Sequence, residues 1–420
     1  MEILPEYGID GNLKQSFRRD KPLSLKQVNR TLEIPFPFDL GSYFDNARTE
    51  ETARLILHDV ILESQGAGRA ISYSANRNHY SGRQVFDGSL YTYRHVVTAI
   101  RTLARIGLIE NHVADNTGPS GQQSIILPTD FLREIIKNPP VFGFNPVQLV
   151  HLKDANKNRV DYRLTEQIRK LCMEIAALNE ATLASDIDFM DTPGVEKRGQ
   201  FLVIDGGGQE PQFANTAYDQ FYSVYNQTWN EGGRKYGHWV QQLSQKGERL
   251  YRDSVTINGN LTSEYDYSCL HGQLIYALAG HRLQVDAYTI DGWERETVKP
   301  AFNILINAER EAQAIGALCW HGIVPDRRAG ERLMDAIRHK HKPIAHLFHS
   351  GLGRRLMRID SDIMGRVIAE LLKMGICPIP IHDSARVETR HFETLIEIME
   401  RNLDKALQQL SRKGEYTRAA

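Results

Sequence analysis

Residues 263–280 constrain the fold of this chain more than any other stretch, because the hydrophobic period changes within them. In the first half, polar residues alternate with Tyr265 and Tyr267, which is the period of a half-buried β-strand. The apolar residues of the second half follow the spacing of one helix face: Leu270, Leu274, Ile275 and Leu278. The sequence therefore predicts a strand that runs directly into a helix.

Asp266 lies at the mouth of this predicted strand, where a carboxylate can hold a hard cation. Mg²⁺ prefers several oxygen ligands, so a lone aspartate needs a partner. The best candidate is Asp383, at the turn of a hairpin predicted over residues 376–388 (I-C-P-I-P-I-H-D-S-A-R-V-E). Two bridging aspartates are the smallest protein set that holds two Mg²⁺ ions about 4 Å apart for phosphoryl transfer. The alternative is that both are turn or capping aspartates.

Three short motifs, in this order along the C-terminal half of the chain, resemble those of two related enzyme families. They are D-Y-S from Asp266, R-E-T-V-K from Arg295 to Lys299, and H-D at His382 and Asp383. The families are the family A DNA polymerases and the single-subunit, phage-type RNA polymerases. The resemblance implies a mixed α+β fold with an antiparallel palm sheet, helical fingers and two Mg²⁺ ions, which Mn²⁺ can replace.

The resemblance also assigns nucleotide-binding and metal-binding roles to further residues. These are Arg295, Lys299, Asn303 and Asn307 on the fingers helix, His271 and His382 for the nucleotide, and the Tyr267 backbone carbonyl for the metal. Arg295 and Lys299 are four residues apart, so they share a helix face and can reach one phosphate group. The polymerases carry an aromatic residue or Met, and then a tyrosine, where this chain has Asn303 and Asn307, although Phe302 is adjacent.

The choice between deoxynucleotides and ribonucleotides stays open. DNA polymerases place a glutamate five residues after the first metal aspartate, and this chain has the bulky His271 there. Ser268-Cys269, Gln273 and Ser384 match the RNA polymerases instead. The steric argument favours deoxynucleotides, and the residue matches favour ribonucleotides.

Residues 91–106 predict a helix with two different faces. Val96, Ile100 and Leu103 recur on one face, and Arg94, Arg101 and Arg105 on the other. A strand, the turn N-T-G-P-S-G, a second strand and another helix follow. This order resembles a winged helix-turn-helix, whose second helix enters the major groove of DNA. A solvated basic face or a protein contact is the alternative.

The prolines of N-P-P-V-F-G-F-N-P predict a domain boundary. We expect an N-terminal arm and winged-helix-like DNA-binding domain over residues 1–140 and a polymerase-like core over residues 141–420. Within the core we expect a thumb-like helix at about 163–184, palm segments at about 215–285 and 360–390, fingers at about 290–350, and a C-terminal helix at 391–420. The thumb-like segment can equally be an ordinary scaffold helix.

Further basic residues are candidates for contacting a template or primer strand. They are Arg234, Lys235, Arg249, Arg354 and Arg355. Gly232 and Gly233 would let the backbone near Arg234 approach a ligand, and an aromatic core patch is the alternative there. The histidines at positions 339, 341, 346 and 349 fit no zinc pattern, so we expect them to be solvated or to face phosphates.

The composition limits the classes of partner and compartment. A formal net charge of -1 gives no global field toward nucleic acid, so binding has to come from local basic faces. The four cysteines are scattered without a C-x-x-C pair, which argues against a zinc site and for a reducing cytosol. We see no export signal and no apolar run that predicts a membrane span, so we expect a cytoplasmic protein.

These observations together predict a template-dependent nucleotidyltransferase, a family A-like DNA polymerase that extends or primes a strand. Its expected partners are DNA and nucleoside triphosphates. An RNA polymerase or primase that uses ribonucleotides is one alternative, and a catalytically inactive DNA-binding replication initiator or regulator is another. The pairing of a winged helix with a minimal polymerase core motivates the hypothesis of mobile-element replication.

Overall fold

The computed structural model describes residues 18–24, 29–32, 39–66, 68–80, 90–114, 123–135, 142–145, 148–206, 211–246 and 249–418 of the 420-residue chain. Most of the predicted arm, the tip of the predicted wing and much of the predicted domain boundary lie outside these residues. The described part combines helices with several antiparallel sheets. A mixed α+β fold is therefore confirmed.

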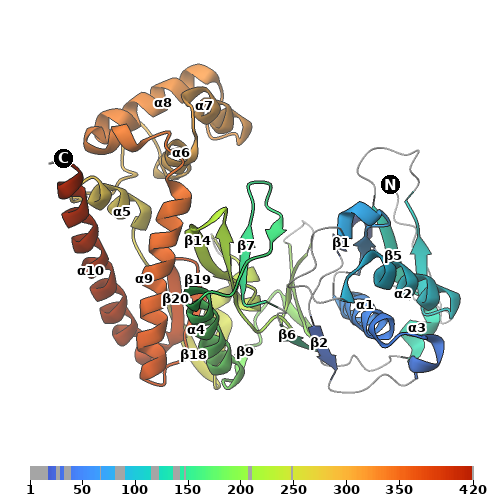
Figure 1. Cartoon of the computed structure of the whole chain (residues 1–420). Coiled ribbons are helices and arrows are strands. Elements are labelled where there is room, and N and C mark those ends of the chain that lie inside the picture. Colours follow the sequence, from blue (N-terminus) through green and yellow to red (C-terminus); the bar gives the residue numbers. More distant parts are fainter. Residues whose placement is uncertain are drawn as a thin grey trace.

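The N-terminal part combines three helices with a four-stranded sheet (Figure 1). The helices are α1 (Ala47–Gln65), α2 (Tyr93–Arg105) and α3 (Asp130–Ile135). In spatial order the strands are β1 (Arg18–Ser24), β3 (Arg69–Tyr73), β5 (Ser124–Pro128) and β4 (Ile109–His112). β1 runs parallel to β3, and the other neighbours are antiparallel. The start of the chain thus adds a strand to this sheet.

The helix α2 has the two faces that its sequence predicts. Thr92 caps its first turn by accepting a hydrogen bond from the backbone of His95. Its apolar residues are buried in the core between α1 and the sheet: Val96, Ala99, Ile100 and Leu103. Its three predicted basic residues are exposed: Arg94, Arg101 and Arg105. Packing of one face therefore leaves a continuous basic face in solvent.

A five-stranded sheet forms the centre of the C-terminal part. In spatial order its strands are β19 (Ile379–Ile381), β20 (Ser384–Glu388), β18 (Asn260–Asp266), β17 (Val255–Ile257) and β9 (Ile187–Phe189). All neighbouring strands are antiparallel. Pro380 lies in β19 at the sheet edge, which is where a strand tolerates a residue without an N–H. The predicted strand-to-helix change is seen as β18 followed by α5 (Leu270–Leu278).

Helices cover both faces of this sheet. On one face, α5, α9 (Gly353–Lys373) and α10 (Phe392–Arg418) pack together (Figure 1), and they enclose Tyr267, Ala385 and Val387. On the other face, Ile379 and Ile381 join a second cluster that includes side chains of α4 (Glu166–Leu183). Residues that alternate along β18 and β20 therefore belong to different layers.

The remaining elements surround this centre. A second sheet has the order β14 (Thr228–Tyr236), β13 (Tyr222–Asn226), β7 (Val150–Lys153) and β8 (Arg159–Val160), and β14 packs along α9. The helices α6 (Arg295–Asn307), α7 (Glu311–Trp320) and α8 (Arg327–Lys340) form a group at the top of Figure 1. Smaller sheets pair β2 (Asn29–Leu32) with β6 (Phe142–Asn145), β15 (Gln245–Lys246) with β16 (Arg249–Leu250), and β10 (Val195–Arg198) with β11 (Phe201–Ile204) and β12 (Gln212–Asn215). Within the described residues, no helix has both the length and the apolar composition needed to cross a membrane.

Gly66 provides a test of the packing between the N-terminal part and β11. It follows α1, and a Cβ added there would lie 2.4 Å from the ring of Phe201 in β11. We expect Gly66→Ala to lower the free energy of unfolding by about 1–3 kcal/mol, because the overpacked ring has to shift. Urea denaturation followed by circular dichroism measures this loss. The matched control is Gly316→Ala in α7, where an added Cβ meets no atom within 4 Å. Equal stabilities of the two variants would contradict the predicted contact.

Candidate active site

The pairing of β18 with β20 brings the two predicted aspartates together. Asp266 is the last residue of β18 and lies opposite Ser384, the first residue of β20. Opposite Cα atoms in an antiparallel pair are about 4.5–5.5 Å apart, and one further residue adds about 3.8 Å. Asp383 directly precedes Ser384, so the Cα atoms of the two aspartates lie within about 10 Å of each other.

A tight turn presents Asp383 at this position. Only His382 and Asp383 join β19 to β20. His382 has a left-handed φ of 61°, whereas Asp383 does not have a positive φ. This is the pattern of a two-residue type II′ hairpin, whose twist matches that of the flanking strands. The ring of His382 lies 5.5 Å from the ring of Tyr236 in β14. This contact places His382 against the second sheet.

The surroundings of Asp266 favour its protonated form. Loss of hydration raises the pKa of its carboxyl group to about 6, although part of the residue is exposed. That value already includes the carboxylates of Asp383 and Glu264, which also raise this pKa, and the positive charges of Lys299 and Arg252, which lower it. A carboxyl group whose pKa is raised by burial and by a neighbouring carboxylate is typical of sites that bind cations or move protons.

Arg234 of β14 connects this pair to a third aspartate, which the sequence did not identify. Its Nη2 lies 2.7 Å from Oδ2 of Asp360 and 3.7 Å from Oδ1 of Asp383. The side chain of Asp360 is fully buried in α9, and this burial raises its pKa to about 6. The sequence pattern could have identified Asp360, because this residue falls between Leu356 and Met364 on the buried stripe of its helix. A carboxylate at such a position needs a charged partner.

Lys235, which we expected to contact nucleic acid, lies against α9 instead. Its Nζ donates to the carbonyl and the Oγ of Ser361, at 3.3 and 3.5 Å. The Ser361 hydroxyl in turn donates to the carbonyl of Gly233. Gly233 has a φ of 92°, and a Cβ there would lie 3.0 Å from Ser361 Oγ. Gly233 therefore permits a close approach between this strand and α9 rather than to a ligand.

The predicted nucleotide-binding helix is α6. Arg295 and Lys299 are both exposed at its beginning, and Lys299 faces the aspartate pair closely enough to lower the pKa of Asp266. Nε of Arg295 donates to Asp286 at 2.8 Å, and its guanidinium carbon lies 5.2 Å from the centre of the Tyr288 ring. These contacts hold the Arg295 guanidinium and leave its terminal nitrogens available to an anion.

The second half of α6 has a structural role. Phe302 is fully buried and its ring packs near Phe348, 5.9 Å between centroids, so it is not placed to stack on a base. The side-chain nitrogen of Asn307 donates to the carbonyl of Asn303 at 2.8 Å. A Cβ at Gly353 would overlap Asn307 Oδ1 at 1.9 Å, so Asn307 packs directly on the start of α9. Asn307 thus packs at the junction of α6 and α9.

His271 belongs to the first turn of α5 and faces the same centre. Burial lowers its pKa to about 4, with Arg234 acting in the same direction and Asp383 against it. The imidazole is therefore neutral at neutral pH, and its Nε2 has no hydrogen-bond partner among the described residues. The side chain of Tyr267 points the other way, because its hydroxyl donates to the carbonyl of Met399 at 2.6 Å. The Tyr267 hydroxyl therefore lies away from the aspartate pair, and the predicted metal ligand on this residue is its backbone carbonyl.

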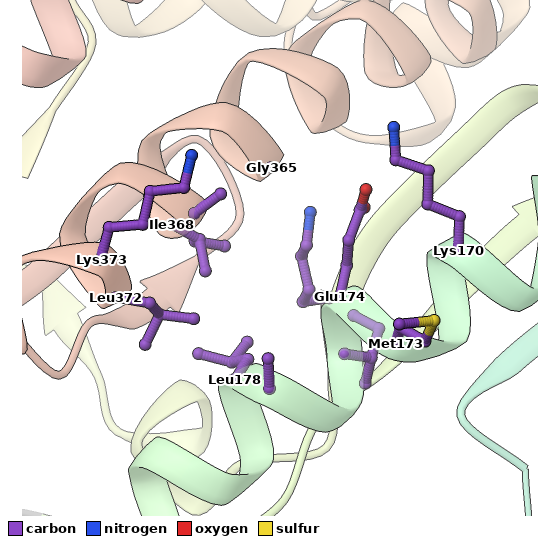
Figure 2. A pocket seen from close by; sticks show the side chains of 12 residues that line it. Lys170, Met173, Glu174, Leu178, Gly365, Ile368, Leu372 and Lys373 are labelled. Atoms are coloured by element: carbon purple, nitrogen blue, oxygen red, sulfur yellow. The ribbon is translucent and has the colours of Figure 1, made fainter.

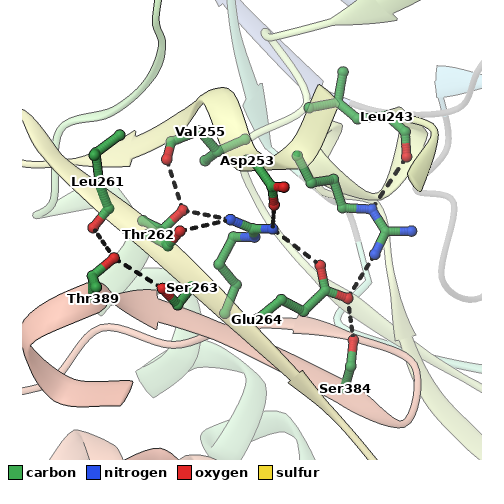
Figure 3. Close-up of polar contacts among 11 residues, drawn as sticks. Leu243, Asp253, Val255, Leu261, Thr262, Ser263, Glu264, Ser384 and Thr389 are labelled. Carbon is green, nitrogen blue, oxygen red and sulfur yellow. Dashed lines mark hydrogen bonds and ion pairs between the residues drawn. The ribbon is translucent and has the colours of Figure 1, made fainter. Parts of the chain in front are cut away.

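A polar network holds β18 in register below the aspartate pair (Figure 3). Glu264 accepts hydrogen bonds from Arg252 Nη1 and Ser384 Oγ, both at 2.6 Å. The fully buried Arg386 donates to Asp253 at 2.9 Å and to Glu264 at 3.4 Å. Buried charges are stable only when they are paired in this way. The network holds Glu264 next to the aspartate pair, where its carboxylate accepts hydrogen bonds from Arg252 and Arg386.

The other predicted binding residues lie outside this centre. Arg94, Arg101 and Arg105 are on α2, Arg355 is exposed on α9, and Arg354 on α9 pairs with Glu231 of β14 at 2.7 Å. The side chain of Arg249 lies outside the part of the structure that is described.

One expectation about the histidines was wrong: His341 is fully buried, with Nδ1 2.9 Å from the Tyr276 hydroxyl and Nε2 2.9 Å from the Ala287 carbonyl. His341 therefore belongs to the core and is not solvated.

Asp266 and Asp383 are the carboxylates best placed to hold a divalent cation. Glu264 and Asp360 are nearby, but each is hydrogen-bonded to an arginine. Within the described residues, no group of three or more His, Cys, Asp and Glu side chains is arranged to hold a metal ion. A cation at the pair would therefore need water and substrate oxygens to complete its shell, which is the usual situation for Mg²⁺ at phosphate-transfer sites.

No family model, no curated protein and no solved structure matches this chain. Its function therefore has to be inferred from the geometry of the site.

The raised pKa of Asp266 gives a testable pH dependence. A carboxyl group with a pKa raised from 3.8 to about 6 destabilises the fold progressively as pH rises through that window. We expect Asp266→Asn, studied without divalent ions, to be more stable than the unchanged protein by about 1 kcal/mol at pH 7.5, after allowing for solvent exposure. The difference should vanish near pH 4. Urea denaturation at the two pH values measures it, and Asp404→Asn on exposed α10 is the control. A variant that is equally or less stable at pH 7.5 would exclude this electrostatic strain.

Proposed function

We propose that this protein is a template-dependent nucleotidyltransferase that extends or primes a nucleic-acid strand with nucleoside triphosphates. The proposal rests chiefly on one observation, the convergence of Asp266 and Asp383 at the ends of two paired strands. These are the two residues that the polymerase-like motifs single out. Magnesium bound there would lower the pKa of the attacking 3′-hydroxyl and stabilise the leaving pyrophosphate.

The chain's own side chains suit the handling of a triphosphate. Lys299 supplies a positive charge toward Asp266, and Arg295 lies one helical turn away on the same exposed face. The contact of Arg295 with Asp286 holds its guanidinium in place before an anion arrives. Such preorganised positive groups stabilise the charge of a transferring phosphoryl group without reorganising during the reaction. The neutral His271 then offers a hydrogen bond near the sugar.

The N-terminal part supports a DNA-docking role. Helix, strand, helix and hairpin follow one another as α1, β3, α2 and β4–β5, and a winged helix contains these elements in this order. If α2 is the recognition helix, its exposed arginines would be the residues that meet DNA. Phosphate contacts from such a face would position the duplex, and the C-terminal part would then act on a strand.

One observation favours a second candidate, a DNA-binding replication initiator or regulator without catalysis. The Arg234 guanidinium already supplies a positive charge to Asp383, at 3.7 Å, and this lowers the need for a metal there. Asn307 of α6 also packs on α9, and neither Asn303 nor Asn307 presents an aromatic ring. In this candidate, the aspartate pair is a structural remnant and the basic face of α2 carries the function.

Primer extension on a primed template with Mg²⁺, using separate deoxynucleotide and ribonucleotide pools, tests the proposal. We expect Asp266→Asn and Asp383→Asn to reduce product formation at least about 10³-fold, because each removes a bridging carboxylate. Lys299→Ala should reduce it about 10²-fold by removing a transition-state contact. Asp404→Asn on α10 should retain full activity, and circular dichroism checks that every variant is folded.

The outcomes separate the candidates. Product with ribonucleotides alone would assign an RNA polymerase or primase. No product with either pool, combined with tight duplex binding, would favour the regulator. Activity that survives both aspartate substitutions would refute catalysis at this site.

The salt dependence of duplex binding tests the role of α2. The double variant Arg101→Ala/Arg105→Ala should bind duplex DNA more weakly, and its slope of log K against log salt should be shallower by about 2, one for each lost phosphate contact. Fluorescence anisotropy of a labelled duplex measures both quantities. A control with the same loss of charge is Lys405→Ala/Arg412→Ala on α10, at the opposite end of the molecule in Figure 1. Equal slopes for the two double variants would exclude a specific role for α2.

A further inference from the structure

A pocket of about 450 Å³ lies between α4 and α9, outside the candidate active site (Figure 2). Its walls are aliphatic and include Ile175, Leu178, Ile368 and Leu372. None of its lining residues is aromatic, and all of them belong to the described part of the chain. Its size falls within the range of small-molecule sites, which are about 300–1,000 Å³. The pocket is thus suited to an aliphatic group better than to a stacked base.

The charges around this pocket are mainly positive. Three lysines line it, Lys170, Lys235 and Lys373, against a single acidic residue, Glu174. Figure 2 shows Lys170 and Lys373 on opposite sides of the pocket, and both are exposed. Aliphatic walls with a surplus of positive charge favour a ligand that has an apolar body and an anionic end.

The ammonium group of Lys235 has a hydrogen-bond donor that a ligand could use. Its only hydrogen-bond acceptors among the described residues are two atoms of Ser361, at the long distances of 3.3 and 3.5 Å. An ammonium group has three donors, so at least one N–H lacks a protein acceptor. Lys235 is half-buried, and the carboxylates of Asp360, Glu174 and Asp362 act on its charge without accepting a hydrogen bond from it. An anionic group in the pocket would satisfy the unused donor.

We infer that this pocket binds an aliphatic anion, a short hydrocarbon chain that ends in a carboxylate or a phosphate. The chain would lie between α4 and α9, and the anionic end would face Lys235 with support from the lysines of the rim. At about 30 Å³ for each water-sized group, the volume accommodates roughly fifteen such groups. A ten-carbon acid therefore fits. The site is separate from the aspartate pair and does not depend on the proposed polymerase activity.

Isothermal titration calorimetry on the full chain tests this inference with three probes: decanoate, decyl phosphate and uncharged decanol. We expect saturable one-to-one binding of at least one of the two anions with a Kd below about 1 mM. Decanol should bind at least about tenfold more weakly, because it leaves the Lys235 donor without a charged partner. Whichever anion binds more tightly identifies the head group.

Two kinds of variant make the test specific to this pocket. Lys235→Met keeps the length of the side chain and should weaken binding of the anion about tenfold. Gly365→Leu should abolish binding, because a Cβ at Gly365 meets only the Lys235 Nζ at 3.9 Å and the larger side chain would fill the pocket. The matched control is Gly316→Leu in α7, and Ala369→Trp at the exposed rim replaces Gly365→Leu if that variant does not fold. No saturable binding of either anion, equal binding of decanol, or undiminished binding by the pocket-filling variant would each overturn the inference.

Discussion

The antiparallel pairing of β18 with β20 is the interaction on which the site depends. The segments that form it lie more than a hundred residues apart in the chain, and only their ladder of hydrogen bonds brings Asp266 next to Asp383. A slip of one residue would turn Asp266 toward the apolar layer that encloses Tyr267. The register is fixed from both sides, since Glu264 and Arg386 are joined below the pair and Tyr267 is anchored to α10 above it.

The site concentrates negative charge in a region of low hydration. Four carboxylates, Asp266, Asp383, Glu264 and Asp360, approach one another from two elements and a turn, and arginines donate hydrogen bonds to two of them. The pair at the surface is the least compensated part. Repulsion between neighbouring carboxylates lowers the stability of the fold, and natural proteins tolerate such a loss where a function uses the charges. A bound divalent ion, or a substrate that brings its own cations, would reduce this repulsion.

Helix α9 connects the two sites inferred for this molecule. One position on it, Asp360, contacts Arg234 and through it Asp383, and the next position, Ser361, accepts the hydrogen bonds of Lys235. One turn further on, Gly365 and Ile368 line the aliphatic pocket. Neighbouring residues of β14 thus face an acidic centre and an apolar pocket, and the close approach at Gly233 holds this strand on the helix.

The sequence by itself determined the local elements and the two aspartates. The change of period after Asp266, the two faces of α2 and the hairpin around Asp383 all follow from interactions between near neighbours, which a linear pattern records. Only the tertiary structure decided which side chains meet. The partner of Arg234 lies 126 residues away in Asp360, and the predicted nucleic-acid contact of Lys235 became a contact with α9. Periodicity states which face of an element is buried but not what covers that face, so pairings of this kind depend on how distant elements pack.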